Sequence, residues 1–470
     1  MRLTVFGLGY LGLTHAACMA EAGHEVLGVD IAPARVAQLQ AARVPFYEPG
    51  LAELVARGVE SGRLRFSCDY RQAAEFAQLH FIAVGTPERA DSPAADTSAV
   101  EAVVDQLAPL LRGTHVLVGK STVPVGTAAR LQERAANISR ATVDILWNPE
   151  FLREGHAVAD TLRPDRIVVG TGAESTPNGA GTPNGVSSAP ALQKLREVYR
   201  APLERGTPFL VMPWASAELV KSAANAFLAT KISFINAIAE VCEAVGGDVA
   251  AVAEALGYDE RIGHQYLGAG LGFGGGCLPK DVRAFRARAD ECGAGDALAF
   301  LGQVELINAR RRQRVVQLAS ELVAQSPKVA QPSKVAEPAG SARPGLSGAV
   351  ITVLGAAFKP NSDDVRDSPA LHVAAELALR GARVRVCDPQ AVENARRVYP
   401  GLEYPASLAD GVAGADLVIL ATEWREYREL DPVWAAELVA EPVLIDARNA
   451  LDLARWRGAG WQVHALGRGD

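Results

Sequence analysis

Short β-branched segments alternate with helical patterns through the first 170 residues, and this alternation limits the fold more than any other feature. The apolar segments are LTVFG, EVLGVD, LHFIAVG, HVLVGKST, VDILWN and RIVVG. Strands separated by helices form a parallel sheet with helices on both faces. From about residue 348 the alternation returns with AVITVLG, ARVRVCD, ADLVILAT and PVLIDAR. The sequence therefore predicts an α/β protein with two doubly wound sheets.

Between these regions the chain lacks strand patterns and contains the long apolar stretch SAELVKSAANAFLATKISFINAIAEVCEAVG. We therefore expect two Rossmann-like domains joined by a helical middle domain with a long central helix. Stretches rich in Pro, Gly, Ser and Ala cannot bury a core and are expected to be surface insertions. The predicted segments are domain 1–212 with an insertion at 173–190, middle domain 213–325, flexible linker 326–347 and domain 348–470.

Composition excludes several classes of protein. The 470 residues are too many for one core, and 49% hydrophobic with 21% charged residues is typical of soluble proteins. A balance of 54 acidic against 47 basic residues argues against a nucleic-acid partner. No apolar run is long enough to cross a membrane. Six scattered cysteines without a CxxC pair predict no metal site and indicate the cytoplasm.

The first strand and helix are joined by Gly7-x-Gly9-x-x-Gly12. In such a turn the first glycine permits a tight bend, the second lets a pyrophosphate approach, and the third lets helix and strand pack closely. Asp30 lies 18 residues beyond Gly12, where its carboxylate can accept from a ribose 2′-hydroxyl and would repel a 2′-phosphate. The sequence therefore predicts binding of NAD rather than NADP.

Other candidate cofactor contacts follow the predicted strands. Thr86 in VGTP and Thr122 in KSTVPVGT lie at carboxyl ends of strands, where ligands bind in open α/β sheets, although both could simply shape turns. Arg35 either lies near the adenosine or is a solvated helix arginine.

A cysteine follows the glycine-rich stretch YLGAGLGFGGGCLPKD, residues 266–281. If a helix begins at Pro279, Cys277 lies at its N-terminus with Lys280 in the first turn. Both features favour a thiolate nucleophile, and glycines let a substrate approach the sulfur. The alternative, a buried small hydrophobic residue, is assigned to the other five cysteines.

An NAD site combined with a nucleophilic cysteine predicts a four-electron oxidation. An alcohol would lose a hydride, the aldehyde would be trapped as a thiohemiacetal, and a second hydride transfer would give a thioester for hydrolysis. Such chemistry needs a base and a stabiliser of the oxyanion. Lys221 and Asn225 lie at i and i+4 on one helix face, and the further candidates are Glu150, Glu154 and Asp281.

Nearly the whole chain resembles the UDP-glucose/GDP-mannose dehydrogenase family. The motifs that carry the resemblance are GLGYLGL, STVPVG, NPEFLREG, PDRIVVG, KSAANAF, RIGHQYLGAGLGFGGGCLPKD, FKPNSDDVRDSPAL, ATEWREY and DARN. The resemblance implies oxidation of the sugar C6 alcohol of UDP-glucose to a uronate with two NAD, and a homodimer built on the long central helix.

The resemblance also implies site residues. Catalysis would use Cys277 as nucleophile, Lys221 with Asn225 as stabilisers of the C6 oxygen, and Asp281, Thr122 and Glu154 for water activation and proton transfer; the identity of the base stays open. The implied NAD contacts are Gly7, Gly9, Leu11, Gly12, Asp30, Arg35, Thr86, Thr122, Glu154, Lys280 and Arg366. The implied UDP-sugar contacts are Glu150, Phe151, Leu152, Arg153, Glu154, Lys221, Asn225, Arg261, Tyr266, Leu267, Gly268, Ala269, Gly270, Gly274, Lys359 and Arg448.

Three alternatives remain open on the sequence. The first is a GDP-mannose 6-dehydrogenase, because CLPKDVRAF is also similar to those enzymes. Gly276 and Leu278 also depart from the serine and phenylalanine that are common in the family. A 3-hydroxyacid or 6-phosphogluconate type dehydrogenase needs one hydride transfer and no thiol, but leaves the third domain unexplained. A non-enzymatic NAD sensor is the third alternative.

Overall fold

The computed structural model describes residues 1–172, 189–325 and 346–469. The chain forms two compact units, Met1–Ala224 with Arg283–Gly295, and Asn225–Val282 with Asp296–Asp470. Three helical elements contain a boundary between them: α10 (Trp214–Val245), α12 (Leu278–Glu291) and the 3-10 helix η2 (Gly295–Leu298). The two predicted insertions fall mostly outside the described residues. Of their described residues, Ala189 begins a helix and Leu346 is buried.

The first unit is built on an eight-stranded sheet in the order β10-β9-β8-β7-β4-β1-β2-β3. Its strands are β1 (Arg2–Phe6), β2 (Glu25–Val29), β3 (Leu64–Ser67), β4 (Leu79–Ile82), β7 (Thr114–Gly119), β8 (Thr142–Trp147), β9 (Ile167–Thr171) and β10 (Phe209–Pro213). All neighbours are parallel except β8 and β9, which pair antiparallel at Trp147 and Gly170. The prediction of a purely parallel sheet is wrong at this edge, since strand direction leaves no trace in an apolar pattern.

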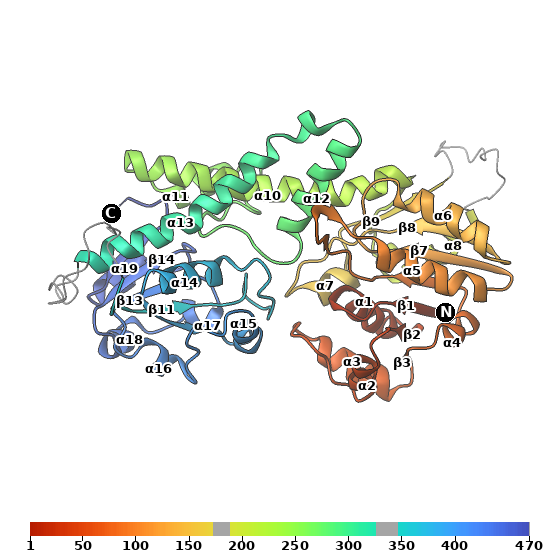
Figure 1. Cartoon of the computed structure of the whole chain (residues 1–470), viewed down its shortest axis with the longest axis horizontal. Helices are drawn as coiled ribbons and strands as arrows, with labels where there is room; N and C mark the ends of the chain where they lie inside the picture. Colours follow the sequence, from red (N-terminus) through yellow and green to blue (C-terminus); the bar gives the residue numbers. More distant parts are fainter. Residues whose placement is uncertain (173–188, 326–345, 470) are drawn as a thin grey trace. The chain divides into compact units, whose positions relative to one another are not determined.

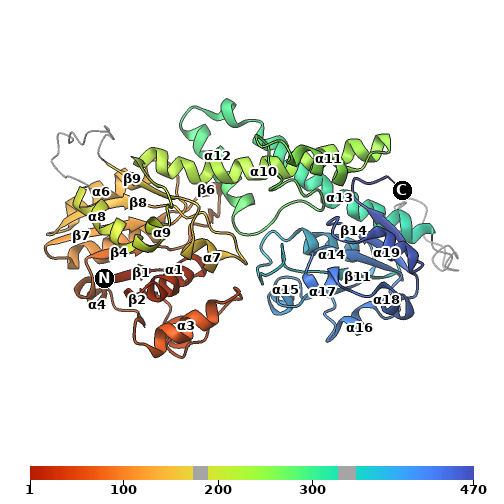
Figure 2. The ribbon, with the colours of Figure 1, turned by 180° about the vertical axis from the view of Figure 1, so that it is seen from behind.

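Helices bury their apolar faces on both sides of this sheet (Figures 1 and 2). One core contains residues of α1 (Tyr10–Glu21), α3 (Leu51–Glu60) and α8 (Ala189–Val198). The other contains residues of α4 (Tyr70–Phe76), α5 (Ser98–Leu107) and α6 (Thr127–Ile138). The remaining elements are α2 (Pro33–Gln40), β5 (Glu88–Arg89), β6 (Ser92–Ala95), η1 (Ala108–Leu110), α7 (Ala157–Leu162) and α9 (Arg200–Glu204).

The second unit contains a five-stranded, fully parallel sheet in the order β12-β11-β13-β14-β15. The strands are β11 (Val350–Leu354), β12 (Arg383–Cys387), β13 (Leu417–Leu420), β14 (Val443–Asp446) and β15 (Gln462–Ala465). The helices are α11 (Val249–Gly257), η2 (Gly295–Leu298), α13 (Leu301–Gln325), α14 (Pro369–Leu379), α15 (Val392–Val398), α16 (Leu408–Val412), α17 (Arg425–Arg428), α18 (Pro432–Leu438) and α19 (Leu453–Gly458).

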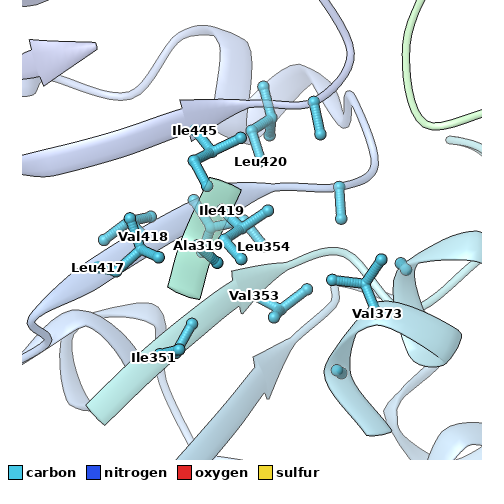
Figure 3. Packing of buried hydrophobic residues seen from close by; sticks show 14 of the residues in the cluster. Ala319, Ile351, Val353, Leu354, Val373, Leu417, Val418, Ile419, Leu420 and Ile445 are labelled. Atoms are coloured by element: carbon cyan, nitrogen blue, oxygen red, sulfur yellow. The ribbon is translucent and has the colours of Figure 1, made fainter. Parts of the chain in front are cut away.

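Aliphatic side chains pack closely in the part of the second sheet's core that Figure 3 shows. Ile351 and Val353 on β11 and Ile419 on β13 are fully buried, and Ala319 of α13 belongs to the same cluster. Near-continuous apolar runs are expected for strands that are buried on both faces. The predicted fold class is confirmed: an α/β protein with two Rossmann-like sheets and a helical region that contains a long helix.

Candidate active site

The turn between β1 and α1 has the geometry that its three glycines predict. Gly7 has φ +89°, and a Cβ on Gly12 would lie 1.7 Å from the Gly7 carbonyl oxygen, so neither position accepts a side chain. A Cβ on Gly9 would meet nothing within 4 Å. No side chain caps α1 at Gly9, which leaves the N–H groups of its first turn available for an anion. These residues fit the pyrophosphate of a dinucleotide.

Asp30 completes this turn at the end of β2. Its buried carboxylate accepts hydrogen bonds from the backbone N–H of Leu8 at 2.8 Å and of Ala32 at 2.9 Å. Arg35 lies 3.2 Å from the same carboxylate. Asp30 therefore holds the glycine turn in place, and Arg35 pairs with Asp30 rather than being fully solvated.

The loops after β4 and β7 are joined to each other. The Thr86 hydroxyl donates to the carbonyl of Thr122 at 2.7 Å, and the Ser121 hydroxyl donates to the carbonyl of Val84 at 2.7 Å. Thr86 thus shapes a turn in this structure, while the two loops lie together at the carboxyl edge of the sheet, where ligands bind in α/β folds.

The loop after β8 carries Glu150. Its Oε2 accepts from the N–H of Leu152 at 2.5 Å, and its Oε1 lies 3.0 Å from Nζ of Lys221. Lys221 is 4% exposed, so the alternative of a solvated surface lysine is wrong. The Phe151 ring lies 5.8 Å from the same Nζ, within range of a cation–π interaction.

Further along this loop, two predicted residues have different surroundings. Arg153 forms a two-pronged pair with Asp160 and is half exposed, whereas Glu154 is buried. The next residue, Gly155, donates its N–H to Glu48 at 2.7 Å, and Tyr10 donates its hydroxyl to the same carboxylate. Burial, reinforced by Glu48, raises the pKa of Tyr10. Sequence reasoning missed both Tyr10 and Glu48, because no local pattern links them to the loop.

The first turns of α10 are anchored to α6. The Glu218 carboxylate accepts from the N–H groups of Gly126 and Ala128, each at 2.7 Å, at the N-terminus of α6. Burial raises the pKa of Glu218, although these hydrogen bonds favour its charged form. Lys221 follows one turn later, so its position on α10 is fixed by this anchor.

Asn225 lies one further turn along α10 and is also buried, so the alternative of an exposed asparagine is wrong. Its amide donates to Oδ2 of Asp281 at 2.6 Å, and Nζ of Lys280 lies 2.7 Å from Oδ1 of the same carboxylate. The Asp281 carboxylate is thus shared by an amide and an ammonium group.

Cys277 lies at the N-terminus of α12, as predicted. The helix begins at Leu278, one residue before the predicted Pro279, and the N–H of Asp281 donates to the Cys277 carbonyl at 2.9 Å. The Cys277 thiol is exposed. Cys18, Cys242 and Cys387 are buried as predicted, but Cys68 and Cys292 are exposed, which contradicts their assignment to the core.

Most glycines before Cys277 pack closely against backbone or side-chain atoms of other segments. A Cβ on Gly270 would lie 2.6 Å from the Ala447 carbonyl, and one on Gly274 would lie 2.3 Å from the Asp367 carbonyl. On Gly276 it would meet the Arg366 guanidinium, whereas on Gly268 it would meet nothing within 4 Å. Most of this run is therefore required by packing, and only Gly268 leaves the open space that a substrate contact needs.

The predicted UDP-sugar cations differ in their surroundings. Arg448 donates to the carbonyls of Ala421 at 2.6 Å, Gly272 at 3.0 Å and Phe358 at 3.2 Å, so it ties the glycine run to the second sheet. Lys359 lies 5.3 Å from the centre of the Phe358 ring. Two further arginines are largely exposed and pair with nearby carboxylates, Arg261 with Asp259 and Arg366 with Asp364.

Remaining predicted contacts are Leu11, which packs at the edge of the first core, the buried Leu267 and Ala269, and Tyr266, which has φ +65°. A surface hollow of about 570 Å³ lies at the amino-terminal edge of the first sheet, next to Arg2, Leu79 and His115, away from the residues above. Within the described ranges, no cluster of His, Cys, Asp and Glu could hold a metal ion. No helix in those same ranges is long and apolar enough to span a membrane.

Two Rossmann-like sheets and an open dinucleotide turn are the features of an NAD-dependent dehydrogenase. The chain matches the UDP-glucose/GDP-mannose dehydrogenase family over three segments: the NAD binding domain at residues 1–200, the central domain at 215–310 and the UDP binding domain at 352–453. The protein belongs to this family and is an NAD-binding nucleotide-sugar 6-dehydrogenase.

Named relatives cover the chain from end to end. A UDP-glucose 6-dehydrogenase of Rhizobium meliloti (strain 1021) is 39% identical over 100% of both chains. The structure of a UDP-glucose dehydrogenase from Pyrobaculum islandicum is 38% identical, covers 98% of both chains and has a TM-score of 0.83. A GDP-mannose dehydrogenase structure from Pseudomonas aeruginosa is 26% identical over 99% of this chain and 100% of its own, with a TM-score of 0.50. The predicted family and NAD cofactor are confirmed.

Proposed function

We propose that this protein oxidises the C6 alcohol of UDP-glucose to the carboxylate of UDP-glucuronate, with two NAD per sugar. The observation that carries the proposal is the exposed Cys277 thiol at the N-terminus of α12, in a chain with a dinucleotide turn. A single hydride transfer to NAD requires no thiol, whereas oxidation to a carboxylate requires a means to trap the aldehyde. This argues against the single-step dehydrogenase alternative.

The choice of UDP-glucose is supported by similarity to enzymes that are named for it. The two UDP-glucose relatives are 38% and 39% identical to this chain, against 26% for the GDP-mannose dehydrogenase. The motifs RIGHQYLGAGLGFGG, FKPNSDDVRDSP and TEWREY point the same way. GDP-mannose remains the second candidate substrate because of Gly276 and Leu278.

The residues of the first unit fit NAD. Gly7, Gly9 and Gly12 would cradle its pyrophosphate at the start of α1, and Asp30 would accept from the adenosine ribose. Arg35 and Thr86 are further proposed contacts from this unit, and Lys280 and Arg366, which belong to the second unit, are proposed as well. When bound, NAD supplies the acceptor for both hydrides.

The protein's own groups would handle the protons and the oxygen. Lys221 and Asn225 would contact the C6 oxygen, and Cys277 would attack the aldehyde carbon to form a thiohemiacetal that a second oxidation converts to a thioester. Water then cleaves the thioester and returns the thiol, with Thr122, Glu154 and Asp281 as proposed partners of that water. Overall, one alcohol, two NAD⁺ and one water give a carboxylate, two NADH and three protons.

Binding of the diphosphate requires cations. We propose Lys359, Arg448 and Arg261 for this role, because guanidinium and ammonium groups bind phosphate oxygens strongly. The Arg448 guanidinium already donates to three carbonyls, so its contribution would include holding the glycine run in shape. Glu150 to Glu154 and Tyr266 to Gly270, with Gly274, are the proposed sugar contacts.

We also propose a homodimer through α10. Phe227, Phe234 and Val241 are spaced seven residues apart on this helix and are 66%, 52% and 55% exposed. A stripe of large exposed apolar side chains indicates a protein interface. Phe234→Glu should raise the monomer fraction measured by light scattering, and an unchanged dimer would contradict this assignment.

The six free cysteines support a reducing compartment such as the cytoplasm.

The proposed function is tested by counting NADH formed per UDP-glucose consumed. We expect two for the wild type, and loss of uronate release in Cys277→Ser. Cys292→Ser is the matched control, since Cys292 is also exposed and lies just beyond the other end of α12. GDP-mannose serves as the competing substrate. A ratio of one, or full turnover in Cys277→Ser, would contradict the proposal.

A further inference from the structure

Lys120, directly after β7, is a buried ammonium group with no role in the proposed chemistry. It is 6% exposed, and its Nζ donates to Oδ1 of Asn148 at 3.2 Å and to the hydroxyl of Tyr199 at 3.3 Å. The Tyr199 hydroxyl in turn donates to the same Asn148 oxygen at 2.7 Å. These partners are neutral, and a buried charge is costly unless an opposite charge compensates it.

The compensating charge is Glu150, which Lys120 shares with Lys221. Glu150 attracts the Lys120 ammonium, and Lys221 repels it. Lys221 itself lies 3.0 Å from the Glu150 carboxylate. One carboxylate therefore interacts with both ammonium groups, and the two ammonium groups repel each other.

The other titratable groups that face Lys120 add no charge near neutral pH. His15, on α1, is repelled by Lys120, and burial holds the pKa of its ring well below the ordinary value. Burial also raises the pKa of the Tyr199 phenol. Among the described residues, Nε2 of His15 has no hydrogen-bond partner. The charged groups that act on Lys120 are therefore Glu150 and Lys221.

We propose that Lys120 is a positioning residue that acts on Lys221 through their shared carboxylate and sets how readily Lys221 releases its proton. Two nearby ammonium groups disfavour each other's charged form. A lysine that contacts the reacting oxygen must not hold its proton too tightly, because the first oxidation removes a proton from the C6 hydroxyl. The inference rests on the proposed function, which places Lys221 at that oxygen.

The first test is the pH dependence of kcat/KM for UDP-glucose in Lys120→Met and Lys120→Arg. Loss of the Lys120 charge in Lys120→Met should shift one limb of the pH profile, the limb that reports titration of Lys221, to higher pH by about one unit. This shift is expected whether the neutral or the charged form of Lys221 is the active one. Arginine keeps its charge at every relevant pH. In Lys120→Arg the same limb should therefore lie at the wild-type pH or at a lower pH. If both variants change the magnitude of kcat/KM but leave the pH of this limb unchanged, the proposal is overturned.

A second test uses the ligand-free protein and does not depend on the substrate. Burial lowers the pKa of Lys120 to about 8 from the ordinary 10.5. Between these values the unfolded chain binds the proton and the folded chain does not, so the free energy of unfolding should rise with pH. Lys120→Met should lose this rise.

The same measurement tests the coupling directly. Removal of the repulsive charge in Lys221→Met should start the rise at higher pH, and removal of the attractive charge in Glu150→Gln should start it at lower pH. If neither variant moves the rise, the coupling is absent. If the wild type consumes no UDP-glucose but these shifts occur, the proposed function fails while the coupling stands.

Discussion

The turns that follow β1 and β11 are built in the same way. Gly7 follows β1 with φ +89°, and its N–H donates to the carbonyl of Val29, the last residue of β2, at 2.8 Å. Gly355 follows β11 with φ +117°, and its N–H donates to the carbonyl of Cys387, the last residue of β12, at 2.7 Å. An aspartate follows the second strand in both cases.

The carboxylates of these two aspartates differ in how many hydrogen bonds they accept from the protein itself. Asp30 accepts from two backbone N–H groups and pairs with Arg35. Asp388 accepts from four backbone N–H groups and from Nε1 of Trp424 at 3.0 Å. The first carboxylate thus retains capacity for a ligand, and the second is used by the protein itself.

The residues after the two glycines differ in the same way. Gly9 has open space where a side chain would point, whereas Ala356 and Ala357 are fully buried in the second core. A glycine turn after a strand can therefore either expose the N–H groups that follow it to a ligand or enclose them. A glycine and an aspartate at these positions do not by themselves show which of the two occurs.

The largest expected effect is on stability in Asp388→Ala. Loss of this carboxylate leaves five donors unsatisfied and should lower the free energy of unfolding by more than about 3 kcal/mol. Urea unfolding followed by tryptophan fluorescence would measure it. Asp30→Ala is the matched control and should lose clearly less; equal losses would break the comparison.

The next effect is on cofactor binding in Asp30→Ala. Loss of a charged acceptor should weaken NAD binding by about 2 kcal/mol and reduce the preference for NAD over NADP. Calorimetric titration with both dinucleotides would measure this. Unchanged affinity for NAD would show that Asp30 only supports the turn.

A smaller effect is expected in Gly9→Ala. Its methyl group meets no protein atom, so the free energy of unfolding should change by less than about 0.5 kcal/mol. The methyl group should nevertheless weaken NAD binding by about 1.4 kcal/mol, because it occupies space that the pyrophosphate needs. A stability loss without a binding loss would contradict the proposed NAD contact.

The smallest effect is expected in Ala357→Gly, the reverse change in the second turn. Loss of a buried methyl and gain of backbone freedom should cost about 1 kcal/mol of stability, measured by urea unfolding. No NAD binding should appear in this unit, because the Asp388 carboxylate already accepts hydrogen bonds from five donors of the protein. Binding of NAD there would show that the two turns are interchangeable.

Local patterns predicted most of the fold and part of the site. Strand and helix periods predicted both sheets, and Pro279 placed the start of α12 within one residue. Long-range contacts were not predictable: Lys120 and Tyr199 are 79 residues apart and no pattern links them. The glycine run was interpreted as space for a substrate, but most of it is packed against residues more than 30 positions away. The exposure of Cys68 and Cys292 likewise depends on tertiary packing.

The helix α10 belongs to both units, and the boundary between Ala224 and Asn225 lies within a single turn that also contains Lys221. Along the axis, Lys221 and Asn225 are therefore separated by about 6 Å, which follows from the rise of an α-helix. Their spacing is set by the backbone hydrogen bonds of that turn and not by the packing of either core. Local fraying of one turn would thus remove the alignment of two proposed catalytic groups while both sheets remained folded.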